Sequence, residues 1–122
     1  MATPSGDRFG VEVESLPGAT VVTLSGELDH DTAQPLREAL GAPLEAGGGE
    51  RLLVDLSRLD FCDSTGLNVL LHGRLAVNAS GGSLELVGVH PPVERMFHIT
   101  GADRLFRFHS DVEAALTAPG HP

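Results

Sequence analysis

The feature that most limits the fold is a short apolar run near the middle of the chain, Leu52-Leu53-Val54-Asp55-Leu56. A run this continuous is typical of a strand that is covered on both faces, as in the interior of a parallel sheet. It therefore predicts a central strand, and the rest of the chain must supply the layers that cover it.

Strand and helix patterns alternate on either side of this run. Phe9, Val11 and Val13 alternate with smaller or charged residues, and the turn signal Pro17-Gly18 predicts a hairpin to the next strand. Strands that alternate with helices indicate a largely parallel sheet. The sequence thus predicts an α/β fold with one mixed sheet of four to five strands, an N-terminal antiparallel hairpin and about four helices. The predicted strands lie at 9–14, 21–24, 52–56, 84–87 and 106–108, and the helices begin near residues 32, 64, 91 and 111.

The predicted domain spans residues 9–117, with a flexible arm at 1–8 and a flexible tail at 118–122. Four details of the helices can be predicted from single residues. Asp31 is a good N-cap for the first helix, and Pro43 should kink or end that helix. Gly101 should be the C-cap of the third helix, and Ser110 or Asp111 should be the N-cap of the last.

Composition excludes several kinds of partner. The chain has 8 basic and 17 acidic residues and a net charge of −9, which argues against binding nucleic acid or an anionic membrane surface. A membrane helix needs about 20 apolar residues, and no segment approaches this; no signal peptide is recognised, so a cytoplasmic location is expected. Cys62 is the only cysteine and is predicted to be a small core residue. Neither a P-loop nor a thiolate-rich zinc pattern occurs, so no cofactor or metal is expected.

Two polar loops are candidates for a functional site because each follows a predicted strand. One is Gly26–Asp31 and the other is Asp60–Ser64. Functional groups in open α/β sheets gather beyond the carboxyl ends of the strands. If the two strands are parallel neighbours, Asp29 and Ser64 come close together.

Ser64 has three candidate roles on its local pattern. It lies where a strand pattern gives way to a helix pattern, and it is predicted to be the N-cap of that helix. The second role, a serine nucleophile, is disfavoured because the G-x-S-x-G pattern is absent and no histidine can be placed beside Ser64 from the sequence. The third role is that of a phosphate acceptor on an exposed turn.

Three segments, taken together and in this order, resemble the STAS-domain anti-sigma factor antagonists of bacteria. They are Gly-Glu-Leu-Asp-His-Asp-Thr-Ala at 26–33, Asp-Ser-Thr-Gly-Leu at 63–67, and Pro-Val-Glu-Arg-Met-Phe at 92–97 followed by Gly101. The resemblance implies a STAS fold and a partner that is an anti-sigma factor and serine kinase. It also implies that the kinase phosphorylates Ser64 and that a PP2C-type phosphatase removes the phosphate.

The resemblance assigns roles to the neighbours of Ser64 as well. Asp29, Asp63, Thr65 and Gly66 would lie near the partner or a nucleotide, and Thr65 would be a second candidate acceptor in place of the more frequent serine. Since the kinase supplies the phosphate, the protein is not expected to be an enzyme. The alternative is a STAS scaffold, or a subunit of a lipid-transport complex, that is never phosphorylated.

Overall fold

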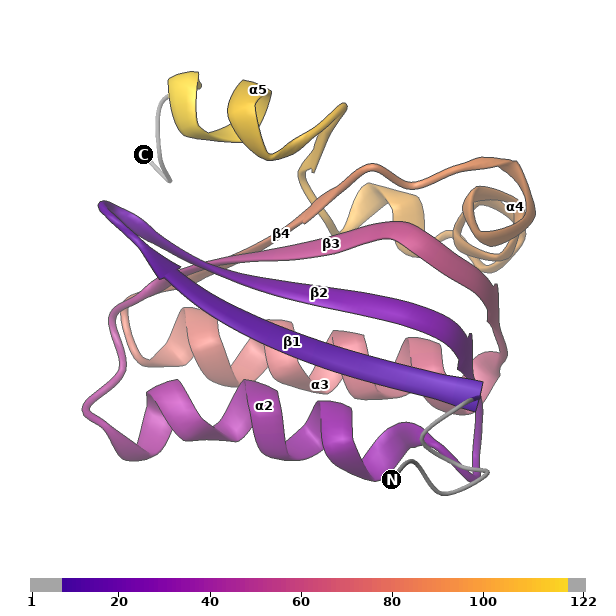
Figure 1. Ribbon diagram of the computed structural model, residues 1–122, viewed down its shortest axis with the longest axis horizontal. Coiled ribbons are helices and arrows are strands. Elements are labelled where there is room, and N and C mark those ends of the chain that lie inside the picture. The colour runs from indigo at the N-terminus through magenta and orange to yellow at the C-terminus, as the bar shows by residue number, and fades with distance from the viewer. Residues whose placement is uncertain (1–7, 119–122) are drawn as a thin grey trace.

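The computed structural model describes residues 8–118, which form a five-stranded mixed sheet covered by helices on both faces (Figure 1). The strand order is β1-β2-β3-β4-β5, with β1 and β2 antiparallel and the other pairs parallel. This confirms the predicted fold class and order of elements. The elements are β1 (Phe9–Leu16), β2 (Ala19–Leu28), α2 (Ala33–Glu45), β3 (Arg51–Cys62), α3 (Ser64–Ala79), β4 (Ser83–Val87), α4 (Pro91–Thr100), the 3-10 helix η1 (Ala102–Arg104), β5 (Phe108–His109) and α5 (Val112–Thr117).

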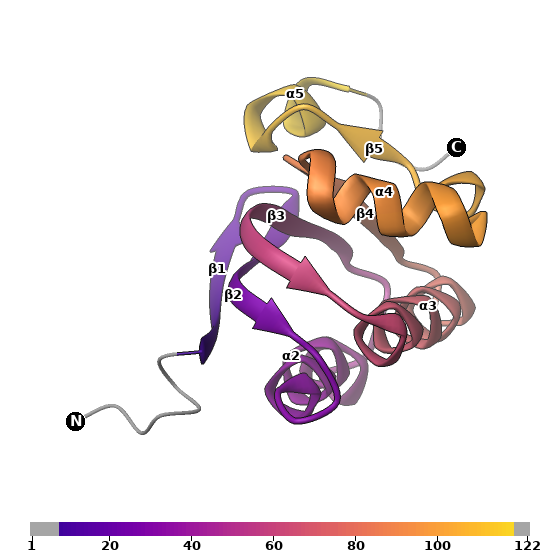
Figure 2. The ribbon, with the colours of Figure 1, turned by 90° about the vertical axis from the view of Figure 1, so that its right-hand side faces the viewer.

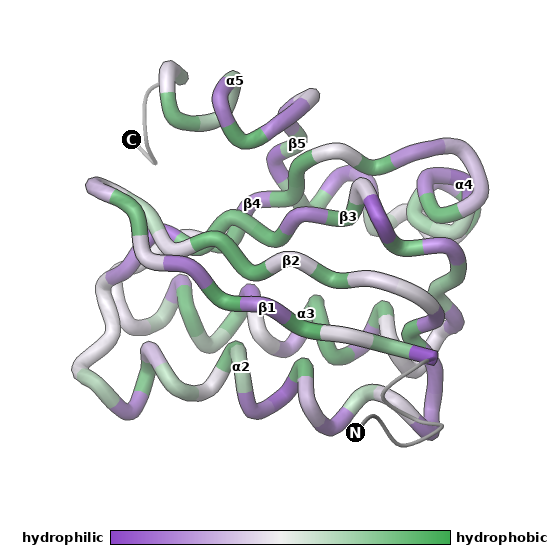
Figure 3. The backbone as a smooth tube through the Cα atoms, in the orientation of Figure 1, coloured by the Kyte–Doolittle hydropathy of each residue, from purple (hydrophilic) through white to green (hydrophobic). Residues whose placement is uncertain are grey.

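The helices form two layers. Helices α2 and α3 lie side by side under the sheet and α5 lies over its other face, while α4 covers the end of the sheet where β3 finishes (Figures 1 and 2). Hydrophobic residues recur along the strands and along α2 and α3, between hydrophilic ones (Figure 3). Each face of the sheet thus has its own helical cover.

The central strand shows why its sequence is almost continuously apolar. Leu52, Val54 and Leu56 belong to the large core under α2 and α3, whereas Leu53 belongs to the smaller core under α5. All four are fully buried. Alternate side chains of a strand point to opposite faces, so a strand covered on both faces needs apolar residues at nearly every position.

The carboxyl ends of β2 and β3 extend further than predicted. β2 reaches Leu28 and β3 reaches Cys62, so most of the two segments expected to be loops are strand. The two strands remain paired along this length, and the register of their pairing shifts twice, between Thr23 and Ser25 and between Gly26 and Glu27. Such irregularities locally interrupt a pattern without ending the strand.

The start and end of α2 also differ from the prediction. Asp31 is not its N-cap; that position is Thr32, and the helix begins at Ala33. Pro43 does not end the helix, which continues to Glu45. Pro43 has no backbone N–H, so it removes one hydrogen bond near the C-terminus of the helix. Leu36 and Leu40, which precede Pro43, are packed in the core and still hold the helix.

Three other predictions about single residues are confirmed. Gly101 ends α4 with a positive φ of 79°, and Asp111 caps α5 by accepting a hydrogen bond from the Ala114 amide at 2.7 Å. Cys62 is buried. Burial raises the pKa of its thiol to about 12, and the Asp63 carboxylate adds to the shift, so Cys62 is an inert core residue.

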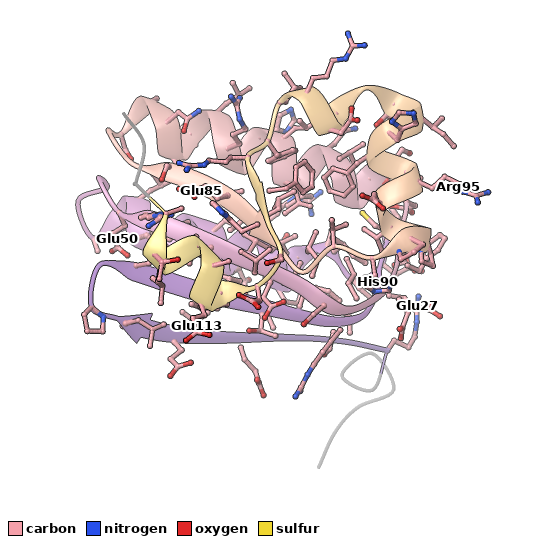
Figure 4. All side chains as sticks on the ribbon, turned by 90° about the horizontal axis from the view of Figure 1, so that it is seen from above. Glu27, Glu50, Glu85, His90, Arg95 and Glu113 are labelled. Carbon is pink, nitrogen blue, oxygen red and sulfur yellow. The ribbon has the colours of Figure 1, made fainter. Side chains whose placement is uncertain are left out.

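A buried carboxylate, Glu85, joins three strands and a helix. It lies near α5 in the view from above (Figure 4) and is 3% exposed. It accepts two hydrogen bonds from Arg51, at 2.9 and 3.0 Å, and one from Ser83 at 3.0 Å, and it contacts the His109 ring at 2.7 Å. Arg51 also donates to the Ala115 carbonyl at 2.7 Å. Burial alone would raise the pKa of Glu85, but these partners lower it to about 2.

The lowered pKa of Glu85 makes this network a source of stability that depends on pH. A carboxyl whose pKa falls from 4.5 to about 2 on folding contributes fully above pH 4.5 and loses the contribution as pH falls toward 2. We expect Glu85→Gln to lower the free energy of unfolding by about 3 kcal/mol at pH 7, and by much less at pH 2.5. Urea denaturation at several pH values measures this difference.

The control for this experiment is Glu14→Gln. Glu14 is exposed on β1, so its substitution should change the free energy of unfolding by less than about 0.5 kcal/mol at either pH. Equal losses for Glu85→Gln at pH 7 and pH 2.5 would show that the charge of Glu85 contributes nothing.

Candidate functional site

The candidate site is the end of the sheet at which β2 and β3 finish and α2 and α3 begin (Figure 1). The two strands are parallel neighbours, and Leu28 pairs with Cys62. The Asp63 amide donates to the Leu28 carbonyl at 3.1 Å. The structure therefore brings together the two segments that the sequence placed in separate loops, with Asp29 and Ser64 just beyond the paired residues.

The N-cap of α3 is Asp63, and the prediction that Ser64 has this role is wrong. Asp63 has the extended backbone of an N-cap, and its Oδ1 accepts a hydrogen bond from the Gly66 amide at 2.9 Å. Ser64 is the first residue of the helix and is exposed. Both residue types are good caps, but only the residue that precedes the helical backbone can reach the amide three positions on.

The Ser64 hydroxyl is consequently free of any structural task in the described part of the chain. No hydrogen bond in residues 8–118 involves it, so no histidine ring in that range is hydrogen-bonded to it. A serine nucleophile needs a base within hydrogen-bond reach. The arrangement offers an accessible hydroxyl at a helix start and gives the hydrolase alternative no support.

The neighbours of Ser64 are less accessible. Thr65 is half-buried and Gly66 is buried. A Cβ added to Gly66 would lie 2.6 Å from the Leu28 Cγ and 2.9 Å from its Cδ2, so no larger residue fits without displacing Leu28. Gly66 therefore lets the first turn of α3 pack directly against the end of β2.

Asp29 is held in one orientation by its own turn. Its Oδ1 accepts hydrogen bonds from the amides of Asp31 and Thr32, at 2.9 and 3.1 Å, and from the Thr32 hydroxyl at 3.1 Å. Partial burial opposes ionisation, but the bonds from Thr32 and Asp31 and the charge of Arg8 lower the pKa of Asp29. Asp29 is thus a fixed carboxylate at the edge of the site.

Arg8 contributes a cation that the sequence did not predict. Its Nη2 lies 2.6 Å from the Asp29 Oδ2 and 3.9 Å from the Glu27 Oε1. Arg8 had been assigned to the predicted arm at 1–8; residues 1–7 lie outside the described residues, as do residues 119–122 of the predicted tail. The feature of the sequence that comes closest to indicating this contact is Gly26. Gly26 has a positive φ of 84°, and its missing side chain leaves room for the Arg8 backbone.

His90 and Phe61 are two further residues that sequence reasoning missed. The His90 Nε2 lies 2.6 Å from the Leu59 carbonyl oxygen, which ties the start of α4 to β3. Figure 4 shows His90 at the same end of the molecule as Glu27. Phe61, which pairs with Glu27 in the sheet, is 48% exposed. An exposed aromatic ring therefore lies on the strand that leads directly into Ser64.

Comparison with known proteins identifies the family of this chain. A family described as "Mlab, STAS domain" matches residues 11–107. The chain belongs to the STAS family. Its motifs at 26–33 and 63–67 thus lie together at one end of a STAS fold.

The relatives of this STAS protein include curated regulators. An anti-sigma F factor antagonist of Paenibacillus polymyxa is 33% identical over 107 residues, covering 88% of this chain and 92% of the relative. The anti-sigma-F factor antagonist RsfB of Mycobacterium tuberculosis is 32% identical, with 91% of this chain and 89% of the relative covered. A crystal structure of an anti-sigma factor antagonist from Mycobacterium paratuberculosis superposes with a TM-score of 0.81 at 32% identity, covering 96% of this chain and 97% of that one.

These relatives bear on two further predictions. Anti-sigma factor antagonists are regulatory binding proteins, which agrees with the prediction that the protein is not an enzyme. Within residues 8–118, no helix has the length and apolar character needed to cross a membrane.

The division of roles between Asp63 and Ser64 can be tested by stability measurements. We expect Asp63→Ala to lower the free energy of unfolding by about 1 kcal/mol, because the Gly66 amide loses its acceptor. Ser64→Ala should change it by less than about 0.5 kcal/mol. Urea denaturation at pH 7 compares the two, and a loss at Ser64 as large as that at Asp63 would contradict the cap assignment.

Proposed function

We propose that this STAS protein is an anti-sigma factor antagonist whose binding is switched off by phosphorylation of Ser64. The observation that carries the proposal is the exposed Ser64 hydroxyl, which has no structural role because Asp63 caps the helix. The similarity of the whole chain to curated anti-sigma factor antagonists supports the choice of partner class. In this proposal the partner is an anti-sigma factor with serine kinase activity, a PP2C-type phosphatase reverses the modification, and the cycle takes place in the cytoplasm.

A phosphate on Ser64 should leave the fold unchanged. A phosphoserine carries about −1.5 to −2 charges, and the dipole of a helix N-terminus favours such a group by about 0.3–1 kcal/mol. The carboxylates of Asp29, Asp60 and Asp63 oppose it by like-charge repulsion. These effects are similar in size and opposite in sign, and the exposed position leaves the phosphate hydrated.

The same phosphate would strongly disfavour a buried interface. The exposed Phe61 on the strand before Ser64 is suited to anchor a partner surface, and such a surface would cover the Ser64 hydroxyl. Burying a dianion without a matching cation costs several kcal/mol. Since about 1.4 kcal/mol corresponds to a tenfold change in affinity, a cost of about 4 kcal/mol would weaken binding nearly a thousandfold.

The other residues of the proposed site have distinct roles. Asp63 places a fixed negative charge next to the acceptor, and Asp29 adds a second carboxylate whose charge Arg8 partly neutralises. A basic partner surface is therefore favoured before phosphorylation, and repulsion between Asp63 and the phosphate grows after it. Thr65 is half-buried, which makes it the poorer of the two acceptors. Gly66 is buried and has no side chain to offer a partner. Its role is to let α3 pack closely against Leu28.

Phosphorylation is tested directly by incubating the protein with the anti-sigma factor kinases of the source organism and ATP. Mass spectrometry should find a single phosphate on Ser64, and Ser64→Ala should abolish it. Thr65→Ala is the matched control and should be phosphorylated like the wild type. Absence of phosphate from both positions would contradict the switch and favour the alternative, a STAS scaffold or a subunit of a lipid-transport complex.

The interface model is tested separately with Ser64→Glu. This variant should bind the anti-sigma factor at least tenfold more weakly than the wild type, because a charge is buried without a partner, while its melting temperature stays unchanged. Calorimetric titration and thermal denaturation measure the two quantities, and Asn68→Glu, at an exposed position one turn along α3, is the control for added negative charge. Wild-type affinity in Ser64→Glu, or loss of its fold, would refute the interface model.

A further inference from the structure

Arginines are gathered around one cavity of this acidic protein. All eight basic residues of the chain are arginine, and three of them, Arg74, Arg104 and Arg107, line a single cavity of about 410 Å³. The net charge of the chain is −9, so a cavity surrounded by cations contrasts with the rest of the molecule. Arg74 lies ten residues after Ser64 along α3, or about 15 Å at 1.5 Å per residue, which places the cavity away from the proposed phosphorylation site.

The cavity is built from elements that are far apart in the sequence. Its walls come from α3, from the first half of β4 and from residues 104–107, which run from the last residue of η1 to the start of β5. The residues are Arg74, Asn78, Ser83, Leu84, Glu85, Arg104, Leu105, Phe106 and Arg107. Figure 2 shows β5 and the segment before it running along the outer side of β4. Within residues 8–118, β5 pairs only with Leu86 and Val87, so in that range the first half of β4 borders the cavity and has no strand on this side.

The backbone of β4 adds a polar group to this edge. The amides of Leu86 and Gly88 donate to the carbonyls of Arg107 and His109, at 2.9 and 3.0 Å. In a parallel strand every second amide points to the same neighbour. The Leu84 amide therefore points to the same edge, beside the cavity.

Two carboxylates close to Arg74 and Arg104 have other partners: Glu85 lines the cavity, and Asp103 precedes Arg104 in the chain. Glu85 is engaged by Arg51 and His109, and Asp103 lies 3.2 Å from the His98 ring. Among residues 8–118, no ion pair or hydrogen bond involves the side chains of Arg74 or Arg104. Guanidinium groups that share one cavity repel each other, and an anion between them would remove that repulsion.

We propose that this cavity binds a small organic phosphate. Arginine presents a planar set of donors that matches the oxygens of a phosphate. The buried Leu84 and Phe106 and the half-exposed Leu105 supply an apolar wall for the organic part. The volume falls within the range of about 300–1,000 Å³ found for small-molecule sites. The site is independent of the Ser64 switch, because it uses other residues at another edge of the sheet.

Calorimetric titration with phenyl phosphate, at an ionic strength held constant with sodium chloride, tests this proposal. We expect saturable binding at one site per chain, and binding at least tenfold weaker in the double variant Arg74→Gln/Arg104→Gln. Arg58→Gln/Arg95→Gln is the matched control, because it also removes two positive charges and both arginines are exposed and outside the cavity. Binding heats that do not saturate, or an equal loss of affinity in the control, would show that the phosphate is attracted only by general positive charge. Either result would overturn the proposal.

Two further comparisons identify the ligand class. Inorganic phosphate should bind more weakly than phenyl phosphate, and Leu105→Ala should remove most of that difference; equal affinities in the wild type would overturn the organic part of the proposal. A glutamate-rich peptide should not compete, and a peptide that binds where phenyl phosphate does not would assign the cavity to a protein partner instead. On addition of phenyl phosphate, amide chemical shifts should move at residues 78, 84 and 105–107 and not at Ser64. Melting temperatures confirm that each variant is folded.

Discussion

The parallel pairing of β2 with β3 is the interaction on which the rest of this structure depends. It lies in the middle of the sheet, and its last rungs join Leu28 to Cys62 and the Asp63 amide to the Leu28 carbonyl. This register decides which residues meet where the strands end. A shift by one residue would turn the side chains at the end of β3 to the opposite face and break the hydrogen bond between the Asp63 amide and the Leu28 carbonyl.

The start of α3 divides three tasks among adjacent residues. Asp63 satisfies the helix amide, Gly66 allows close contact with Leu28, and Ser64 lies between them with an exposed hydroxyl. A residue that held the helix together could not be modified without cost to the fold. Because the cap is one position earlier, the candidate acceptor is separate from the stability of the helix.

The sequence was a good guide where the determining pattern is local or repeated. The apolar run at Leu52–Leu56 predicted the central strand, and Gly101 and Asp111 correctly marked helix ends, because each signal is contained in a few neighbouring residues. The cap of α3 was placed one residue late, since Asp63 and Ser64 have equal preference and only the backbone angles distinguish them. The role of Arg8 could not be predicted, because its partner Asp29 is 21 positions away and meets it only after the hairpin has formed. The arginine cavity was missed for the same reason, since Arg74 in α3 lies about 30 positions before Arg104 and Arg107 in the sequence.

The tight contact between Gly66 and Leu28 has a consequence for timing. The first turn of α3 is packed against β2 without room for a single added carbon at Gly66, so it cannot move closer to β2 when Ser64 is modified. In the proposed switch, no slow rearrangement of the protein would follow the transfer of a phosphate. The delay between a signal and the release of the partner would then be set by the kinase, the phosphatase and the dissociation of the complex, and the antagonist would add none of its own.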